Sequence, residues 1–270
     1  MIVFWLKGDT VSKTAARHDR IREHLASRAY VNIHDLALTT GVSEVTIRRD
    51  LRTLEQLGIV ARAHGGARLA DDSTQAQELF AARELRNPDA KSAIGLRAAE
   101  LIDVGEHVAM NDGTTVMQVA ASLDQKHIPA TVTTNALNVA LRLSESELID
   151  VYVLGGLVRR ASFGTYDADT SSLDRLNFDT VILGIESMSE TGITVDHPFD
   201  LAIAQSMIRR AARVIVVADA SKWRRRGRMA LAAWDEVDLL VTDTPPSGAE
   251  AACLAGFGVE ILSTEKEGDR

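Results

Sequence analysis

Between residues 108 and 242, short apolar runs alternate with segments of helical periodicity, and this alternation restricts the fold more than any other feature. The runs have the length of buried strands and lie at Val108–Met110, Thr131–Thr134, Val151–Leu154, Val181–Ile185, Val214–Ala218 and Leu239–Thr242. The helical segments lie at Val116–Leu123, Ala136–Leu143 and Asp200–Ala212. Repeated strand–helix alternation predicts an α/β fold, with a mostly parallel, Rossmann-like sheet covered by helices on both faces.

Residues 17–69 follow another pattern, that of three helices and a hairpin. The second helix is expected to end at Gly41, a residue suited to a left-handed turn. Residues 59–69 predict two short strands joined by a glycine turn, which would form a wing beside the helices. The first two helices are expected at Arg17–Arg28 and Ile33–Thr40.

The third helix of this part follows the glycine turn directly. Ser43 is a preferred N-cap, and the helix is expected to run to about Leu57 and to end at Gly58. Apolar residues recur at helical spacing and form its buried stripe, namely Ile47, Leu51 and Leu54. Two short helices joined in this way have the proportions of a helix-turn-helix, whose second helix enters the major groove of DNA.

A second set of side chains lies away from the buried stripe, where it can reach DNA. On the helix these are Ser43, Val45, Thr46, Arg48, Arg49 and Arg52, and on the wing they are Arg62, His64 and Arg68. Arginine binds phosphate or pairs bidentately with guanine. The sequence therefore predicts a winged helix-turn-helix, and the alternative is a small helical bundle with a solvated basic face.

Charge is distributed unevenly along the chain, whose net charge is −8. Residues 11–70 hold ten Arg or Lys and six Asp or Glu, a net charge of +4, whereas residues 71–270 hold nineteen and thirty-one, a net charge of −12. A small basic part joined to a larger acidic part favours a nucleic-acid-binding module attached to a second function. The acidic part would repel DNA and confine the contact to the basic part.

One stretch of the basic part resembles the head of the DeoR family of bacterial sugar-metabolism regulators. It comprises Val42-Ser-Glu-Val-Thr-Ile-Arg-Arg-Asp-Leu-Arg-Thr-Leu54, followed by His64-Gly-Gly-Ala67. The resemblance covers residues 17–70, and its motif is highly specific. It implies that Asp50 buttresses the third helix and that four residues lie at the DNA, namely Ser43, Thr46, Arg48 and Arg49.

In the larger part, the first predicted strand leads through Asn111-Asp-Gly-Thr-Thr115 into a helix that starts at Val116. Free backbone N–H groups and the positive end of a helix favour a phosphate at this place. The hydroxyl groups of Thr114 and Thr115 would add donors. Ordinary capping of the helix by the same residues is the alternative interpretation.

Polar residues and glycines also follow other predicted strands, and loops at the carboxyl ends of parallel strands converge on one crevice. These residues are Asn135, Gly155, Gly156, Arg159 and Lys222. A lysine and an arginine would neutralise the phosphate of a small phosphorylated ligand. Each residue also has an ordinary interpretation, because Asn135 can cap a helix, the glycines can turn the chain, and Lys222 can be a surface amine.

These loops, with Gly192–Thr194 and Asp219–Lys222, resemble the DeoR-type sugar-phosphate sensor domain, so that the likeness spans about residues 15–245. It implies a fold similar to ribose-5-phosphate isomerases and CoA transferases. It also implies a phosphorylated sugar as effector, with Asp112, Gly113, Thr114 and Thr115 near the phosphate and Lys222 in the pocket. The expected divisions are an N-terminal extension (1–14), a DeoR-type winged helix-turn-helix domain (15–70), a linker with connecting helices (71–104), the sensor domain (105–262) and a tail (263–270).

Two segments depart from the family pattern. Where the family continues Gly-Ala-x-Gly after a strand, this chain has Gly184-Ile-Glu-Ser-Met-Ser189. Where the family has an Asn and an acidic residue opening the next helix, this chain has Asp196-His-Pro-Phe-Asp200. Glu186, Asp196 and His197 are therefore candidates for polar contacts to the sugar, and a solvated loop is the alternative.

Other residue types set limits on the chemistry. The single cysteine, Cys253, excludes an internal disulfide and favours a reducing compartment. The seven histidines show no metal-ligand spacing, and no Ser-His-Asp arrangement, P-loop or GxGxxG motif is present. We therefore expect no metal, no cofactor and no catalytic residue. The run Trp223–Arg228 can bind a phosphate, contact a partner chain or be solvated.

The apolar runs are too short to span a membrane, and residues 1–7 carry no basic leader, so a cytoplasmic protein without membrane contact is expected. The patterns together predict a DNA-binding repressor of a carbohydrate uptake or catabolism operon that a phosphorylated sugar relieves. Its partners would be double-stranded operator DNA, the phosphorylated sugar and further copies of itself, as a dimer or tetramer. The alternatives are a sugar-phosphate isomerase or transferase with an accessory DNA-binding head, and an activator of the same architecture.

Overall fold

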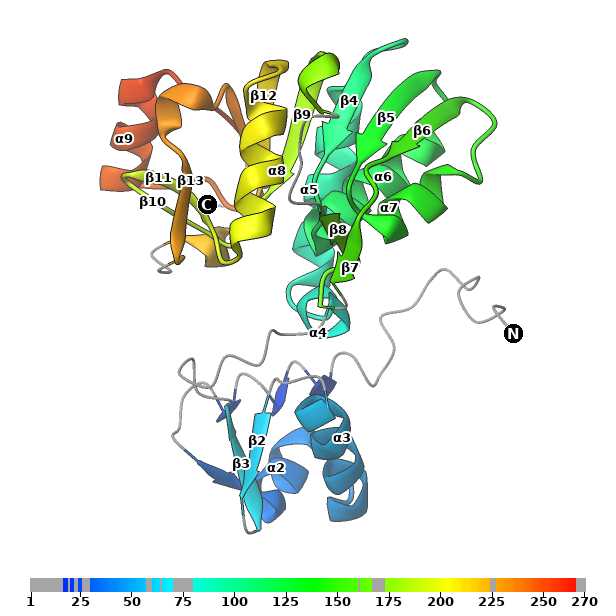
Figure 1. Ribbon diagram of the computed structural model, residues 1–270. Coiled ribbons are helices and arrows are strands. Elements are labelled where there is room, and N and C mark those ends of the chain that lie inside the picture. Colours follow the sequence, from blue (N-terminus) through cyan, green and yellow to red (C-terminus); the bar gives the residue numbers. More distant parts are fainter. Residues whose placement is uncertain are drawn as a thin grey trace. The chain divides into compact units, whose positions relative to one another are not determined.

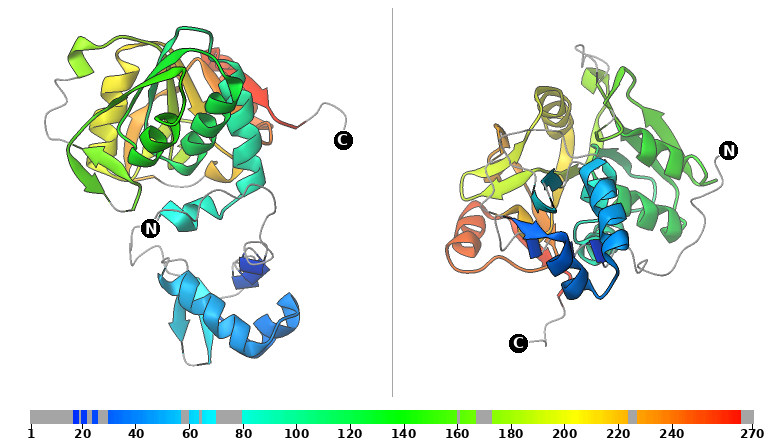
Figure 2. Two further views of the ribbon diagram at one scale, coloured as in Figure 1. Left: turned by 90° about the vertical axis from the view of Figure 1, so that its right-hand side faces the viewer. Right: turned by 90° about the horizontal axis from the view of Figure 1, so that it is seen from below.

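The computed structural model divides into two compact units, residues 1–86 and residues 87–270. Figures 1 and 2 show a small unit of helices and short strands and a larger unit built on a twisted sheet. The residues that the structure describes are 17–18, 20–21, 24–25, 30–56, 60–63, 65–69, 80–159, 161–166, 173–223 and 227–265.

The first unit is a winged helix-turn-helix, as the sequence predicts. Its helices are α2 (Ile33–Thr40), α3 (Glu44–Gln56) and α4 (Phe80–Glu84), and its strands are β1 (Val31–Asn32), β2 (Val60–Ala63) and β3 (Gly66–Leu69). The described residues between 17 and 25 are helical as well. Gly41 ends α2 with φ 73°, which confirms the expected turn. The strands form an antiparallel sheet in the order β1-β3-β2, in which β1 was not expected.

The core of the first unit contains the expected stripe of α3. Ile47, Leu51 and Leu54 are completely buried and pack with side chains of α2, β1 and β2. The turn of the wing requires a glycine at position 66, because a Cβ atom there would lie 2.3 Å from the carbonyl oxygen of Val31. Wing and helices are therefore held in one arrangement by close backbone contact.

The second unit contains a seven-stranded sheet in which every pair of neighbours is parallel. Its spatial order is β15-β14-β12-β9-β4-β5-β6. Six of these strands coincide with the predicted runs, and β15 is additional. Their bounds are β4 (His107–Met110), β5 (Ala130–Thr134), β6 (Ile149–Val153), β9 (Phe178–Gly184), β12 (Ala211–Val217), β14 (Leu239–Thr242) and β15 (Glu260–Ser263).

Helices cover both faces of this sheet, as expected for a Rossmann-like arrangement (Figure 1). One face packs against α5 (Pro88–Glu100), α6 (Thr114–Lys126) and α7 (Leu137–Leu143). The other face packs against α8 (Pro198–Ile208), α9 (Ala249–Phe257) and a small sheet of β10 (Ser187–Ser189), β11 (Gly192–Val195) and β13 (Met229–Ala232). Short 3-10 helices lie at Leu173–Arg175, Ala220–Lys222 and Trp234–Glu236.

A separate hairpin of β7 (Leu157–Arg159) and β8 (Gly164–Tyr166) follows β6. The backbone N–H of Thr165 donates to the carbonyl oxygen of Asn135 at 2.6 Å, and Leu137 N–H donates to the carbonyl oxygen of Phe163 at 3.0 Å. These bonds attach the hairpin to the loop between β5 and α7. The hairpin is therefore positioned at the carboxyl edge of the sheet.

Several elements differ from the expectation. The helix expected at 200–212 ends at Ile208, and Ala211 and Ala212 belong to β12. The β-branched run that follows them extends the strand backwards, because such side chains favour strands over helices. Within the connecting region expected at 71–104, helix α4 is described from Phe80 to Glu84. The expected end of α3 at Leu57 and Gly58 and the first part of the 71–104 linker lie outside the described residues.

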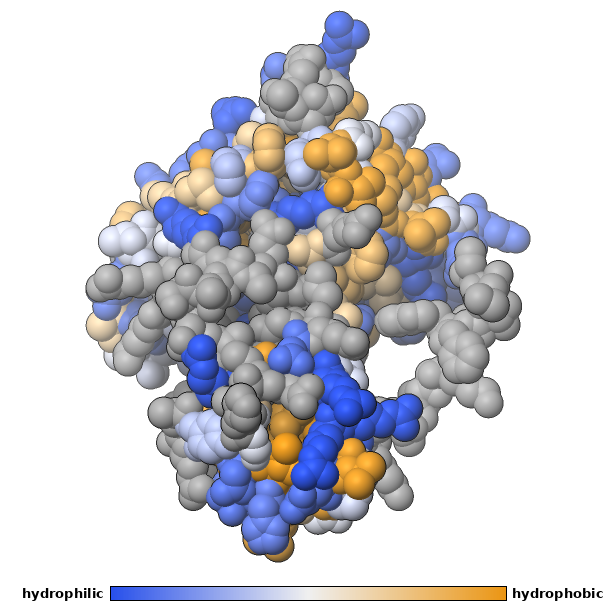
Figure 3. Space-filling model, turned by 60° about the horizontal axis from the view of Figure 1, so that its bottom comes forward, coloured by the Kyte–Doolittle hydropathy of each residue, from blue (hydrophilic) through white to orange (hydrophobic). Residues whose placement is uncertain are grey.

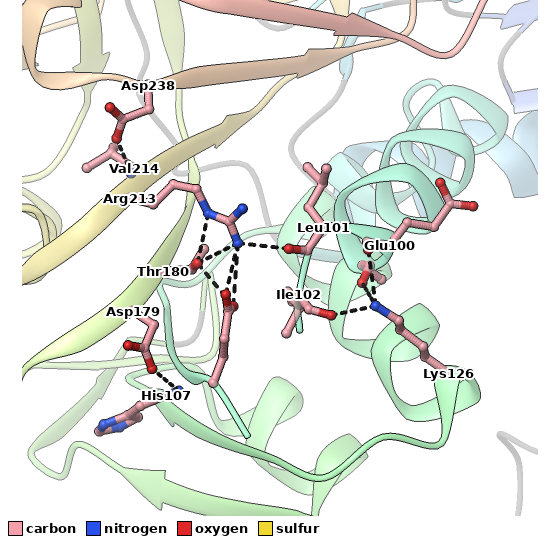
Figure 4. Close-up of polar contacts among 12 residues, drawn as sticks. Glu100, Leu101, Ile102, His107, Lys126, Asp179, Thr180, Arg213, Val214 and Asp238 are labelled. Carbon is pink, nitrogen blue, oxygen red and sulfur yellow. Dashed lines mark hydrogen bonds and ion pairs between the residues drawn. The ribbon is translucent and has the colours of Figure 1, made fainter. Parts of the chain in front are cut away.

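Charged side chains secure the amino-terminal edge of the sheet (Figure 4). Arg213 of β12 donates through Nη2 to the carbonyl oxygen of Leu101 at 2.8 Å, to Thr180 Oγ1 at 2.8 Å and to Glu106 Oε1 at 3.1 Å. Lys126 Nζ donates to three carbonyl oxygens at the end of α5, those of Ala99, Glu100 and Ile102. These carbonyls lie at the carboxyl end of α5, where the positive charge of Lys126 opposes the helix dipole. At the opposite edge, the carboxyl ends of the strands lead into loops.

Candidate DNA-binding surface and effector site

Helix α3 presents its amino-terminal half to solvent. Ser43 Oγ accepts a hydrogen bond from the backbone N–H of Thr46 at 3.2 Å, so that Ser43 is the N-cap that the sequence predicts. Val45 is 73% exposed on this half of the helix. Arg48, Arg49 and Arg52 are exposed on the same helix, and Thr46 is half-buried.

The exposed arginines of α3 differ in their contacts. Arg48 Nη2 lies 2.9 Å from Glu44 Oε2, an exposed pair one helical turn apart. Such a pair contributes only about 0.3–0.5 kcal/mol, so a phosphate or a base can displace it. In the wing, Arg68 is half-buried. The side chain of Arg62 and the whole of His64 lie outside the described residues.

Asp50 ties the back of α3 to the first helix. Its carboxylate accepts from Arg17 Nε at 2.6 Å and from Arg17 Nη2 at 3.1 Å, and His18 Nε2 lies 3.2 Å away. Burial raises the pKa of Asp50, but the hydrogen bonds and charges of Arg17 and His18 outweigh it and hold the pKa below its ordinary value. This is the buttressing position that the resemblance implies for Asp50.

In the second unit, the order of the strands reverses between β4 and β9, because the chain proceeds from β4 to β5 and β6 and then returns to β9 on the other side. Asn111 bridges this point. Its Oδ1 accepts from the N–H of Gly184 at 2.8 Å, and its Nδ2 donates to the carbonyl oxygen of Gly184 at 2.9 Å. Ligands of open parallel sheets bind at such a reversal, at the carboxyl ends of the strands.

Four expected phosphate ligands follow Asn111 directly. Asp112 and Gly113 form the turn, and Thr114 and Thr115 open α6 with both side chains buried. A Cβ atom at Gly164 would lie 3.0 Å from the carboxyl group of Asp112, so the β7–β8 hairpin approaches this turn closely. The amino terminus of a 13-residue helix is thereby placed at the reversal point.

Asn135 lies at the neighbouring strand end, after β5, and is 2% exposed. Its Nδ2 donates to the carbonyl oxygen of Thr165 at 3.2 Å. Its Oδ1 is buried and has no hydrogen-bond partner among the described residues. A buried acceptor without a partner costs about 1–3 kcal/mol, which a ligand hydroxyl group would recover.

Arg159 of the hairpin pairs with α8. Its Nη1 lies 2.5 Å from Asp200 Oδ2, and the ring of Tyr166 stacks on that of Phe199 with centroids 4.2 Å apart. Burial lowers the pKa of His197, and the charge of Arg159 lowers it further, whereas Asp112 opposes the shift. Arg159, Asp112 and His197 therefore lie close enough to influence one another electrostatically.

Lys222 lies on the third strand end of the site, after β12. Its Nζ is 3.7 Å from Glu186 Oε1, which follows β9. Asp196 is exposed and accepts a hydrogen bond from the backbone N–H of Arg228 at 3.1 Å. Gly155 and Gly156 form an exposed turn between β6 and β7, where a Cβ atom on Gly155 would meet open space. The glycines therefore show no feature beyond that of a turn.

Behind Lys222, Asp219 is 2% exposed. Its Oδ1 accepts from Ser221 N–H at 3.0 Å and from Asn87 Nδ2 at 3.0 Å. Burial raises the pKa of Asp219, but these hydrogen bonds and the charges of Lys222 and Lys91 lower it below its ordinary value. Asn87 is the first residue of the second unit and precedes α5 in a left-handed conformation, with φ 47°.

Sequence reasoning did not find Asn87, Thr165 or the pairing role of Asp200. Asn87 lies 132 residues from Asp219 in the sequence, and no local pattern connects the two. Among the described residues, no group of His, Cys, Asp or Glu is arranged to hold a metal ion. Within the same part of the chain, no helix combines the length and apolar character needed to cross a membrane.

A winged helix-turn-helix joined to a parallel α/β unit with polar groups at its reversal point defines a transcriptional regulator with a separate sensor unit. Residues 17–73 match the family model of the DeoR-like helix-turn-helix domain, and residues 86–244 match that of the DeoR C terminal sensor domain. The chain belongs to the DeoR family.

Known relatives are similar over almost their whole length. The HTH-type transcriptional repressor GlcR of Bacillus subtilis is 33% identical, over 92% of this chain and 95% of that one. The glycerol-3-phosphate regulon repressor of Escherichia coli is 30% identical, over 92% and 98%. A ribose 5-phosphate isomerase from Methanocaldococcus jannaschii shares 15% identity over 51% of this chain and 55% of that one, with a TM-score of 0.38. A likeness of that degree says nothing about activity.

We predict that Asp50→Asn destabilises the first unit at pH 7 by about 1–3 kcal/mol, because the buried ion pair loses its charge. A carboxylate with a lowered pKa contributes stability above its unfolded pKa of about 4, and that contribution is lost as the pH falls through the lower, folded value. The difference between the variant and the wild type should therefore shrink below about pH 4.

Hydrogen–deuterium exchange of α3 peptides in the full chain measures the opening of this unit separately. Asp35→Asn is the matched control, because Asp35 forms only an exposed hydrogen bond with Asn32. Equal protection of α3 in Asp50→Asn and the wild type at pH 7 would contradict the prediction.

Proposed function

We propose that the protein is a cytoplasmic repressor of a carbohydrate operon, which binds operator DNA through α3 and the wing and releases it when a phosphorylated sugar binds the second unit. The observation that carries this proposal is the exposed face of α3, with Val45, Arg48, Arg49 and Arg52 open to solvent on a helix anchored by its buried stripe. The names of GlcR and of the glycerol-3-phosphate regulon repressor support the repressor role.

Each exposed group of α3 suits one component of DNA. Arg49 and Arg52 can pair with guanine edges or phosphates, and Val45 can contact the methyl group of thymine. The hydroxyl groups of Ser43 and Thr46 lie at the helix amino terminus, where phosphate oxygens are favoured. Arg48 would exchange Glu44 for a phosphate, and Arg62 and His64 of the wing would contact the adjacent backbone.

The effector site would hold a phosphate at the amino terminus of α6, between Asp112–Thr115 and the cations of neighbouring strand ends. Lys222 and Arg159 are each paired with a carboxylate, Glu186 and Asp200. A phosphate oxygen can replace either carboxylate with the same charge-assisted bonds. Asn135 Oδ1 would then accept a hydroxyl group of the sugar, and Asp196 would contact its far end.

Effector binding would reach the DNA-binding unit through Asp219. This carboxylate contacts Asn87 at the boundary of the two units, and its pKa is lowered in part by the charge of Lys222. An effector that moves Lys222 changes the electrostatic surroundings of Asp219. A coupling free energy of about 1–3 kcal/mol would change operator affinity about 5–150-fold.

We infer that the site binds its ligand without converting it. The relatives are named for regulation, and the cations of the site are already paired with carboxylates. We also infer a dimer or tetramer, because helix-turn-helix proteins read paired half-sites. An activator of the same architecture would use the same contacts with the opposite effect on transcription.

Arg49→Ala should weaken binding of operator DNA about 5–150-fold, the free energy of one good base contact. Arg48→Ala should weaken specific and non-specific binding alike and lower the salt dependence, because its contact is with phosphate. Fluorescence anisotropy with DNA from upstream of the gene, at several salt concentrations, measures both. Arg97→Ala, an exposed arginine of α5, is the control. Unchanged binding by the double variant Arg48→Ala/Arg49→Ala would contradict the DNA-binding role of α3.

Lys222→Met and Asp112→Asn should leave operator binding intact and abolish its release by sugar phosphates. Anisotropy with a panel of phosphorylated sugars and the matching free sugars measures the response, and thermal stabilisation measures binding separately. Arg97→Met serves as the control. Normal release in both variants would place the effector elsewhere, and turnover of a sugar phosphate by the wild type would support the enzyme instead.

Asn87→Ala should preserve effector binding and weaken its effect on operator affinity. The effector should still stabilise the protein, since Asn87 lies behind the site, whereas its effect on operator affinity should fall at least about tenfold with the loss of one charge-assisted hydrogen bond. Asp89→Ala, an exposed residue in the first turn of α5, is the control. A wild-type response of operator affinity in Asn87→Ala would exclude this connection.

A further inference from the structure

Strand β6 forms one of the two edges of the seven-stranded sheet, and β15 forms the other. Strand β6 is the last strand on its side, and no strand in the described part of the chain pairs with its outer edge. An open edge presents unpaired N–H and C=O groups, which another strand can bind. Among the described residues, the adjacent hairpin pairs β7 with β8 and forms one bridge to Ala136, and neither strand pairs with β6.

Large apolar side chains are exposed at this edge. Tyr152 and Val153 of β6 are 60% and 47% exposed, and Leu157 and Val158 of β7 are 66% and 46% exposed. Figure 3 shows apolar side chains gathered on the side of the second unit that carries these strands. We call Tyr152, Val153, Leu157 and Val158 the apolar edge. Large apolar side chains gathered on one part of a surface mark an interaction site in soluble proteins.

Charge is absent from this part of the surface. Residues 151–158 read Val-Tyr-Val-Leu-Gly-Gly-Leu-Val, without one charged side chain in a protein that is 25% charged. Natural edge strands are usually protected by charges or prolines. The opposite edge of the same sheet, β15, begins with the exposed Glu260 and is followed by Glu265. The β15 edge therefore carries charges that protect it, whereas residues 151–158 at the β6 edge carry none.

We propose that the apolar edge binds a second copy of this chain about a twofold axis, with β6 antiparallel to the partner's β6. An uncharged surface is self-complementary, because a twofold axis brings a surface against its own copy and would bring like charges together. The nearest charge on β6 is Asp150. Any pairing centred between residues 151 and 153 places Asp150 opposite an uncharged residue, so no carboxylates meet.

This inference rests on the proposed function, since two DNA-binding units must be joined to read paired half-sites. It adds the surface that joins them. The antiparallel pairing would continue the sheet through both copies and bury the four apolar side chains of each. The apolar run at residues 2–6 is the competing occupant within the same chain, and the test separates it from a second copy.

Light scattering coupled to size exclusion gives the mass of the full chain and its variants. The wild type should be a dimer or tetramer, and Leu157→Glu should halve its mass, because it places a charge within the apolar edge of each copy. Val104→Glu is the matched control, since Val104 is 70% exposed and lies outside the apolar edge. A monomeric wild type, or an unchanged mass in both Leu157→Glu and Tyr152→Glu, would overturn the proposal.

Cross-linking provides a second test that does not disturb the surface. In a Cys253→Ser background, single cysteines at positions 151, 152 and 153 should include one that forms a disulfide between two copies, because residues nearest a twofold axis face their own counterparts. Val104→Cys in the same background should not. Failure at all three positions would overturn the proposal. If the mass of the protein rises only after removal of residues 1–14, that segment occupies the apolar edge instead of a second copy.

The outcome can be distinguished from failure of the proposed function. Leu157→Glu should keep the thermal stabilisation by sugar phosphates and lose at least about tenfold in affinity for a two-half-site operator, while binding a single half-site as the wild type does. A wild type that assembles through the apolar edge but binds no specific DNA would contradict the regulator and retain the surface.

Discussion

The double hydrogen bond between the side chain of Asn111 and the backbone of Gly184 fixes the place on which the sensor unit depends. It joins the ends of β4 and β9, the two strands between which the order of the sheet reverses. A reversal leaves the loops on either side diverging, so that polar groups can enter between them. The turn at Asp112 and the amino terminus of α6 lie on one side of Asn111, and Glu186 lies on the other. The side-chain amide of Asn111 therefore determines which groups face each other at the site.

Both cations of the site form ion pairs with carboxylates of the chain. Arg159 with Asp200 and Lys222 with Glu186 join elements that are distant in sequence, and each pair lies at a strand end. Each carboxylate neutralises a partly buried cation, which would be costly to leave unpaired. They also set a threshold, because a ligand must supply an anion as good as the carboxylate it replaces. A phosphate meets that requirement, whereas a neutral sugar does not.

Periodicity was sufficient to predict the fold class, because the six expected strands are short, largely apolar runs that alternate with helical segments along much of the chain. The helix-turn-helix followed from Gly41, the cap at Ser43 and the stripe of Ile47, Leu51 and Leu54. The hairpin of β7 and β8 could not be predicted, since its strands have three residues each and the bonds that attach it go to the segment after β5. The site was predicted only as a set of strand ends. Contacts such as Asn87 with Asp219 depend on how distant segments pack, which no local pattern records.

A chain with a net charge of −8 must bind anions locally if it is to bind them at all. In the first unit this is achieved by exposed arginines on one face of α3, at the end of the chain where positive charge is concentrated. In the sensor unit, whose sequence is acidic, the field is supplied by the backbone N–H groups at the start of α6 and by two cations within a few ångströms of carboxylates. Screening limits charges elsewhere on the surface to a reach of about 8–10 Å at physiological ionic strength. In the proposed function, local geometry would therefore decide which anion is bound, and the acidic remainder of the chain would keep DNA at the first unit.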